Sequence, residues 1–154
     1  MRVIPHSSRR WLSMVGWWRF WDLTIRSTCK GRIQMALNPY SLCPCGSGKK
    51  VKFCCSKDIV ADLDRLVRKL AGDQRMACLS LVDQLIERHG VRASLMIIKI
   101  MLAGEMEKLD VARQAADQLL KREPDNASAM VELSIVTAME GEVQEAAGVL
   151  QRAI

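Results

Sequence analysis

Residues 43–55 read CPCGSGKKVKFCC, and this stretch decides how the first part of the chain folds. It holds four of the six cysteines, in the order C-x-C, eight further residues and then C-C. Four thiolates at such compact spacing suit one tetrahedral divalent ion, most often zinc. The expected ligands of a single structural zinc ion are Cys43, Cys45, Cys54 and Cys55.

Glycine and proline within this stretch favour the same site. Gly46 and Gly48 can adopt backbone angles that are closed to other residues, so the chain can reverse tightly and bring the second cysteine pair back to the first. The reversal also lets backbone N–H groups point at sulfur, as donors around thiolate sites do. Pro44 stiffens the link between the first two ligands. Spacing and turn chemistry together predict one compact metal-binding loop.

Three other chemistries fit residues 43–55 less well. A phosphate-binding loop needs glycine where Cys43 stands and Ser or Thr where Lys50 stands. A disulfide between the neighbours Cys54 and Cys55 is sterically poor. Catalytic zinc needs an acid or a base beside it, and the stretch contains no His, Asp or Glu. We therefore predict a structural metal site.

The stretch resembles the SEC-C motif, the small zinc module at the C-terminal tail of the SecA preprotein-translocase motor, which also occurs in many small bacterial proteins. The family pattern is C-x-C-G-S-G-x-K-[FYW]-K-x-C-[CH], and this chain keeps the cysteines, the Gly-Ser-Gly and both lysines. It departs at Val51, where the family has an aromatic residue; we expect Phe53, two residues later, on the same face of the turn. The resemblance covers residues 38–55 and includes no part of the ATPase motor.

The resemblance implies that all four cysteines bind zinc and that the module is a docking tag. In the motor, the module docks onto the SecB chaperone and the ribosome through a basic and apolar surface. The matching surface here would be formed by Lys49, Lys50, Lys52 and Phe53. We therefore expect a bacterial, cytoplasmic adaptor without enzymatic activity, whose partner is a protein: a chaperone, the ribosome or a peptide.

Charge is spread unevenly along the chain, which limits a second hypothesis, nucleic-acid or ribosome binding. The net charge is +6, but residues 1–34 and 35–58 are basic, whereas residues 59–154 carry more acidic than basic residues. The alternative is weak, salt-dependent binding of nucleic acid or the ribosome through Lys49, Lys50, Lys52 and Lys57, together with Phe53. A hydrolytic enzyme ranks last, because no pair of titratable groups with plausible site spacing occurs.

Residues 1–36 form a basic, Trp-rich N-terminal extension. Its composition fits a helix lying on a membrane surface, a secretory or twin-arginine signal, or a start codon assigned upstream of Met35. The apolar part is short and is interrupted by Arg19 and Asp22, which counts against a signal. We expect membrane contact only if this extension belongs to the native protein, because no apolar run in the sequence is long enough to span a bilayer.

Residues 58–154 read as helices throughout, with a single proline at Pro124. The first apolar stripe ends at Gly72 and consists of Ile59, Val60, Leu63, Leu66, Val67 and Leu70. Later stripes break at Gly90, Gly104, Pro124 and Gly141. Cys78 falls on such a stripe, so we expect it in the core and not at the metal.

A shift of 34 residues overlays residues 78–88 on residues 112–122, and Asp-Gln-Leu and an arginine recur in place. A helical period of this length resembles the tetratricopeptide repeat. The array looks degenerate, because Met130, Thr137 and Leu150 stand where that family has large aromatic residues. In addition, the loop from Gly104 to Ala112 is three residues longer than the loop from Gly141 to Ala146. A plain helical bundle is the alternative.

These observations predict a mainly α protein: a small zinc-bound knuckle followed by antiparallel helical hairpins in a tetratricopeptide-like solenoid. The expected parts are the extension at 1–36, the zinc module at 37–57 and the helical region at 58–154. The last helix lacks a polar cap over Val149, Leu150 and Ala153, so either the sequence is truncated or a second copy covers them. We also expect metal removal to unfold the zinc module and to leave the helices largely intact.

Overall fold

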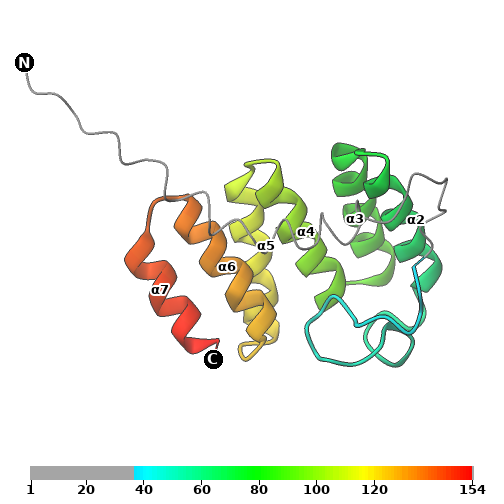
Figure 1. Cartoon of the computed structure of the whole chain (residues 1–154), viewed down its shortest axis with the longest axis horizontal. Coiled ribbons are helices and arrows are strands. Elements are labelled where there is room, and N and C mark those ends of the chain that lie inside the picture. Colours follow the sequence, from blue (N-terminus) through cyan, green and yellow to red (C-terminus); the bar gives the residue numbers. More distant parts are fainter. Residues whose placement is uncertain (1–36, 154) are drawn as a thin grey trace, which may run out of the picture. The chain divides into compact units, whose positions relative to one another are not determined.

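The structure is a computed structural model that describes residues 37–153. The hypotheses on the N-terminal extension lie outside the described residues. Within them the protein is mainly α, as predicted, with six α-helices that follow one another in chain order (Figure 1). The helices are α2 (Val60–Ala71), α3 (Arg75–His89), α4 (Ala93–Glu105), α5 (Leu109–Arg122), α6 (Ala127–Met139) and α7 (Val143–Arg152).

Each helix packs on the next one along the chain, and α4 also packs on α6. The core between them is aliphatic, because no aromatic residue follows Phe53 in the sequence. Its fully buried side chains include Leu63, Leu66, Leu85, Leu95, Ile100 and Leu119. Cys78 lies among them on α3 with no exposed surface, which confirms its predicted place in the core.

The boundaries of the helices repeat with the period seen in the sequence. Helices α3, α5 and α7 begin at positions 75, 109 and 143, and α4 and α6 begin at 93 and 127, so equivalent starts are 34 residues apart. The turns that precede α3, α5 and α7 also match. Their central residues are Asp73, Glu107 and Gly141, and all three have a positive φ of 55°, 56° and 93°. The same turn is therefore built three times, once with glycine and twice without.

Two sequence expectations about the middle turn are wrong. Gly104 does not break a helix, because α4 runs through it to Glu105 and buries it. The turn lies at residues 106–108 and has the same length as the turn at residues 140–142. The physical reason is that Glu107 adopts the left-handed conformation that glycine adopts at position 141, so a glycine search does not find the turn.

The left-handed turn at Glu107 predicts a stabilising substitution. Glu107→Gly removes the steric cost of the positive φ, and it should raise the free energy of unfolding by about 0.5–1 kcal/mol after the greater freedom of the unfolded chain is included. Gln118→Gly, at an exposed site within α5, is the control and should lower that free energy by about 0.5 kcal/mol. Urea unfolding measures the free energy of unfolding of both variants. A lower value for Glu107→Gly would contradict the strained left-handed conformation at this residue.

Candidate metal centre

The first described segment, residues 37–57, is called the knuckle here, and its backbone forms a closed loop. The amide of Cys43 donates to the carbonyl of Lys49 at 2.8 Å, and the amide of Val51 donates to the carbonyl of Ser41 at 2.9 Å. Gly46 and Gly48 have φ of 78° and 70°, so the chain reverses at the two predicted glycines. The loop then continues into a 3₁₀ turn, η2 (Val51–Phe53), that leads directly to the second cysteine pair.

The loop brings all four predicted ligands together. The sulfur atoms of Cys43, Cys45, Cys54 and Cys55 all lie within 4.8 Å of one another. The Sγ atoms of Cys45 and Cys54 are 3.3 Å apart, and those of Cys43 and Cys55 are 3.6 Å apart. A tetrahedral ion with metal–sulfur bonds of about 2.3 Å holds its ligands about 3.8 Å apart, so this donor set fits a single metal ion.

Polar hydrogens surround the sulfur atoms. The hydroxyl of Ser47 lies 3.2 Å from the sulfur of Cys45 and 3.1 Å from that of Cys54. The backbone N–H groups of Cys45, Ser47 and Cys55 act to lower the pKa values of Cys43, Cys45 and Cys54, respectively. Such donors stabilise the negative charge that thiolate ligands carry.

Burial and these hydrogen bonds act in opposite directions on the thiols. Desolvation raises the pKa of Cys43 well above its ordinary value, and the hydrogen bonds to it do not offset this. Desolvation also acts on Cys54, but hydrogen bonds with Ser47, Cys45 and the Cys55 backbone outweigh it and lower the pKa of Cys54 from 9.0 to about 7. Cys54 therefore ionises more readily than Cys43. Metal binding requires this ionisation, because the thiolate and not the thiol is the ligand.

Side chains from α4 and from the residue before it fasten the knuckle to the helices. The hydroxyl of Ser56 lies 3.6 Å from the sulfur of Cys43 and 3.7 Å from that of Cys55. Ser56 also donates to the hydroxyl of Ser94 on α4 at 2.5 Å, and both serines are fully buried. Arg92 donates to the carbonyl oxygen of Cys55 at 2.6 Å. The buried side of the cysteine cluster is thus bonded directly to the start of α4.

Arg92 also bonds a carboxylate just after the knuckle. Its two terminal nitrogens donate to the two oxygens of Asp58 at 2.5 and 2.7 Å. This hydrogen-bonded pair lowers the pKa of Asp58 from 3.8 to about 2. The planar guanidinium group of Arg92 therefore bonds both the carbonyl oxygen of Cys55 and the carboxylate of Asp58, which precedes α2.

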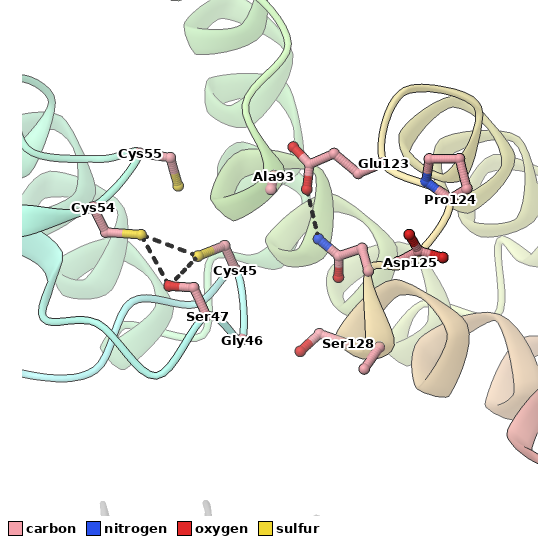
Figure 2. Close-up of a pocket in the computed structure, with 12 residues that line it drawn as sticks. Cys45, Gly46, Ser47, Cys54, Cys55, Ala93, Glu123, Pro124, Asp125 and Ser128 are labelled. Atoms are coloured by element: carbon pink, nitrogen blue, oxygen red, sulfur yellow. Dashed lines mark hydrogen bonds between the residues drawn. The ribbon is translucent and has the colours of Figure 1, made fainter. Parts of the chain in front are cut away.

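The other side of the cluster faces the beginning of α6. Gly46 lies so close to this helix that a Cβ atom built on it would overlap the Ser128 hydroxyl oxygen. Between the cysteines and the turn before α6 lies a cavity of about 520 Å³. Figure 2 shows Cys45, Ser47 and Cys54 on one wall, and Asp125 and Ser128 on the other.

The predicted partner surface is partly assembled on the knuckle. Lys52 donates to the hydroxyl of Tyr40 at 2.7 Å, and its nitrogen lies 4.2 Å from the centre of the Tyr40 ring and 4.9 Å from that of Phe53. The nitrogen of Lys50 lies 5.5 Å from the Tyr40 ring centre. We call Tyr40, Lys50, Lys52 and Phe53 the aromatic–lysine surface. Lys49, the fourth residue predicted there, is exposed.

The structure corrects one expectation about this surface. Val51 and Phe53 were expected on the same face, but Val51 is completely buried and Phe53 is 63% exposed. Both residues belong to the 3₁₀ turn, in which residues two apart point in different directions. Val51 thus fills the core beneath the metal centre, while Phe53 faces solvent.

Sequence reasoning missed several residues of the site. Tyr40 and Leu42 are 54% and 70% exposed beside the loop, and their only signal in the sequence was their apolar character near four lysines. Ser56, Ser94 and Arg92 gave no signal, because they reach the cysteines only through the tertiary fold. No helix among the described residues is long and apolar enough to cross a membrane.

Comparison with known proteins assigns no family to this chain: no family model matches it, and neither a curated protein nor a solved structure matches it.

Proposed function

We propose that the chain is a non-enzymatic adaptor in which one structural zinc ion holds the knuckle in shape and the aromatic–lysine surface binds an acidic protein segment. The observation that carries this proposal is the placement of exposed Tyr40 and Phe53 around the Lys52 ammonium group on the same loop that gathers four cysteines. Zinc is proposed because a set of four thiolates without a hard oxygen ligand favours it over calcium or magnesium. Thiols kept free for a metal are typical of a reducing compartment, so we place the protein in the cytoplasm.

The chemistry of the surface defines the partner. The Tyr40 and Phe53 rings keep enough exposed surface for apolar contact, and the lysine ammonium groups beside them attract carboxylates from the partner. An extended segment that combines acidic and apolar residues would meet both needs. The resemblance of residues 43–55 to the SEC-C docking module supports the same class of partner.

We further propose that the helices form a tetratricopeptide-like array that acts as a scaffold for the knuckle. Helix starts 34 residues apart and three equivalent left-handed turns support this assignment over a plain bundle. Packing of each helix mainly on its neighbours in sequence is also typical of repeat arrays.

Charge reversal tests the proposed surface. Lys50→Glu combined with Lys52→Glu should reduce capture of protein partners from a nuclease-treated bacterial extract about tenfold or more, because it replaces attraction by repulsion. Lys121→Glu combined with Arg122→Glu is the matched control, since it changes the net charge equally at exposed residues of α5. Metal content, measured by mass spectrometry, should stay at one ion per chain in both. Equal losses of capture in the two variants would contradict the proposal.

Single-stranded nucleic acid is the second candidate, and the stacked arrangement of Tyr40, Lys52 and Phe53 favours it. Exposed rings can stack on bases while lysines neutralise phosphates. Fluorescence anisotropy with a labelled single-stranded oligonucleotide, at low and at physiological salt, tests this candidate. Binding that is lost with Phe53→Ala and falls steeply with salt would favour it over the protein partner.

A further inference from the structure

The four cysteines of the metal centre are not equivalent in their access to solvent. Cys45, Cys54 and Cys55 line the cavity between the knuckle and α6, whereas Cys43 does not. Cys43 is only 4% exposed, and Ser56 lies against its sulfur. Cys45 is also buried, at 7% exposed, but it lines the cavity together with the partly exposed Cys54 and Cys55.

The sulfur atoms also form two distinct pairs. Cys43 and Cys55 lie 3.6 Å apart and share Ser56, which is bonded to α4. Cys45 and Cys54 lie 3.3 Å apart and share Ser47, which is exposed. The Cys43–Cys55 pair is thus bonded to α4 through Ser56, whereas both residues of the Cys45–Cys54 pair line the cavity.

We propose that Cys45 and Cys54 are a peroxide-sensitive dithiol, whose oxidation to a disulfide releases the metal ion while Cys43 and Cys55 remain as thiols. The inference rests on the proposed function only in requiring a bound metal ion; it does not depend on the partner. Cys54 reacts first, because it is the more exposed of the pair and lines the cavity.

The chemistry is a two-electron oxidation by hydrogen peroxide. The sulfur of Cys54 attacks one peroxide oxygen, the O–O bond breaks, and one water leaves after protonation. The sulfur of Cys45 then attacks the sulfenic sulfur of Cys54, so that an S–S bond forms, the S–O bond breaks and a second water leaves. Two thiols lose two electrons, and the peroxide is reduced to two waters. The metal ion is left with two thiolate ligands of four, which a closed structural site cannot tolerate.

Peptide mapping tests the pairing. The full chain in its metal-loaded form is treated with increasing hydrogen peroxide, free thiols are alkylated, and disulfides are mapped by mass spectrometry, while a chromophoric chelator records released metal. We expect one metal ion released for each Cys45–Cys54 disulfide formed, with Cys43, Cys55 and the buried Cys78 still alkylated after unfolding. A dominant Cys43–Cys55 disulfide, a mixture of pairings, or release of metal without a disulfide would overturn the proposal.

A second pair of variants tests the route through the cavity. Ala127 is exposed at the start of α6 and lines the cavity, so Ala127→Trp should narrow it and slow metal release by about threefold or more. Ala138→Trp, at an exposed site near the other end of α6, is the control and should leave the rate unchanged. Equal rates in the two variants would show that the oxidant does not enter by the cavity.

These results separate the inference from the proposed function. A chain that is isolated without metal would contradict the metal site, and the same mapping on that chain would still show whether Cys45 and Cys54 are the preferred pair. Normal metal content and normal partner capture with a scrambled disulfide pattern would overturn the redox inference alone.

Discussion

Removal of the metal ion by a strong chelator is expected to lower the melting temperature by more than about 10 °C and to destabilise α2 and α4 together with the knuckle. Structural zinc contributes about 10–16 kcal/mol in isolated zinc-finger peptides, which is as large as the whole folding free energy of an ordinary domain. The knuckle buries few apolar side chains of its own, namely Cys43, Cys45 and Val51, so apolar burial there cannot replace a contribution of this size.

The reason why the effect reaches the helices is the shared core. Cys43, Cys45 and Val51 belong to the same cluster of buried side chains as residues of α2 to α7, to which α7 contributes Val149 alone. Arg92 and Ser94 also lose their bonds to Cys55 and Ser56 when the knuckle unfolds. Because of this shared core, we expect the effect of chelation to reach beyond the knuckle, to which the sequence alone confines the unfolding.

Hydrogen exchange measured by mass spectrometry locates the effect. With chelator, amide protection should fall across the knuckle, α2 and α4, while α7, which packs on α6 at the far end of the array, keeps its protection. Cys54→Ser should reproduce the loss, whereas Cys78→Ala, which removes a buried thiol outside the centre, should retain one metal ion per chain. Unchanged protection in α2 and α4 would contradict the shared core.

Outside the four cysteines, Gly46→Ala is expected to be the most damaging single substitution in the knuckle, with a loss of about 3–4 kcal/mol in the free energy of unfolding. Two costs add at this position. An alanine must adopt the left-handed conformation, since φ is 78°. Its Cβ would also overlap the Ser128 hydroxyl and would stand only 2.7 Å from the Ser128 Cβ, so the knuckle must move away from α6.

Gly48→Ala separates the two costs, because Gly48 has a similar φ of 70° but its Cβ would meet no atom within 4 Å. It should lose only about 1 kcal/mol. Ser128→Gly removes the atoms that overlap, so a double-mutant cycle with Gly46→Ala should show a coupling of about 1–2 kcal/mol. Denaturant unfolding of the metal-loaded chain measures all four variants; equal losses at Gly46 and Gly48 would refute the contact with α6.

The sequence was sufficient to predict the local parts of this molecule. Cysteine spacing and two glycines predicted the clustering of the four cysteines and the positive φ angles, because both depend on residues that are close along the chain. The 34-residue overlay likewise predicted helix starts that recur at that interval. These features follow from local chemistry and from periodicity, and a single sequence contains both.

Features that depend on tertiary contact could not be predicted. Glu107 adopts a left-handed conformation that its residue type disfavours. The sequence pattern therefore predicts the end of the helix at Gly104, although α4 continues to Glu105. The burial of Val51 and the exposure of Phe53 depend on which side of the 3₁₀ turn meets the helices. The contact of Gly46 with Ser128 joins residues that are far apart in sequence, and nothing near either residue signals it.

That same contact between the knuckle and α6 has a consequence for the order in which the chain folds. Helices that pack on their sequence neighbours form from short-range contacts, which close quickly and cost little loop entropy. The knuckle precedes the helices in the chain and leaves the ribosome before them, but the turn that it packs against, around residues 123–128, is synthesised much later. The knuckle is therefore synthesised before the helices but completed after them.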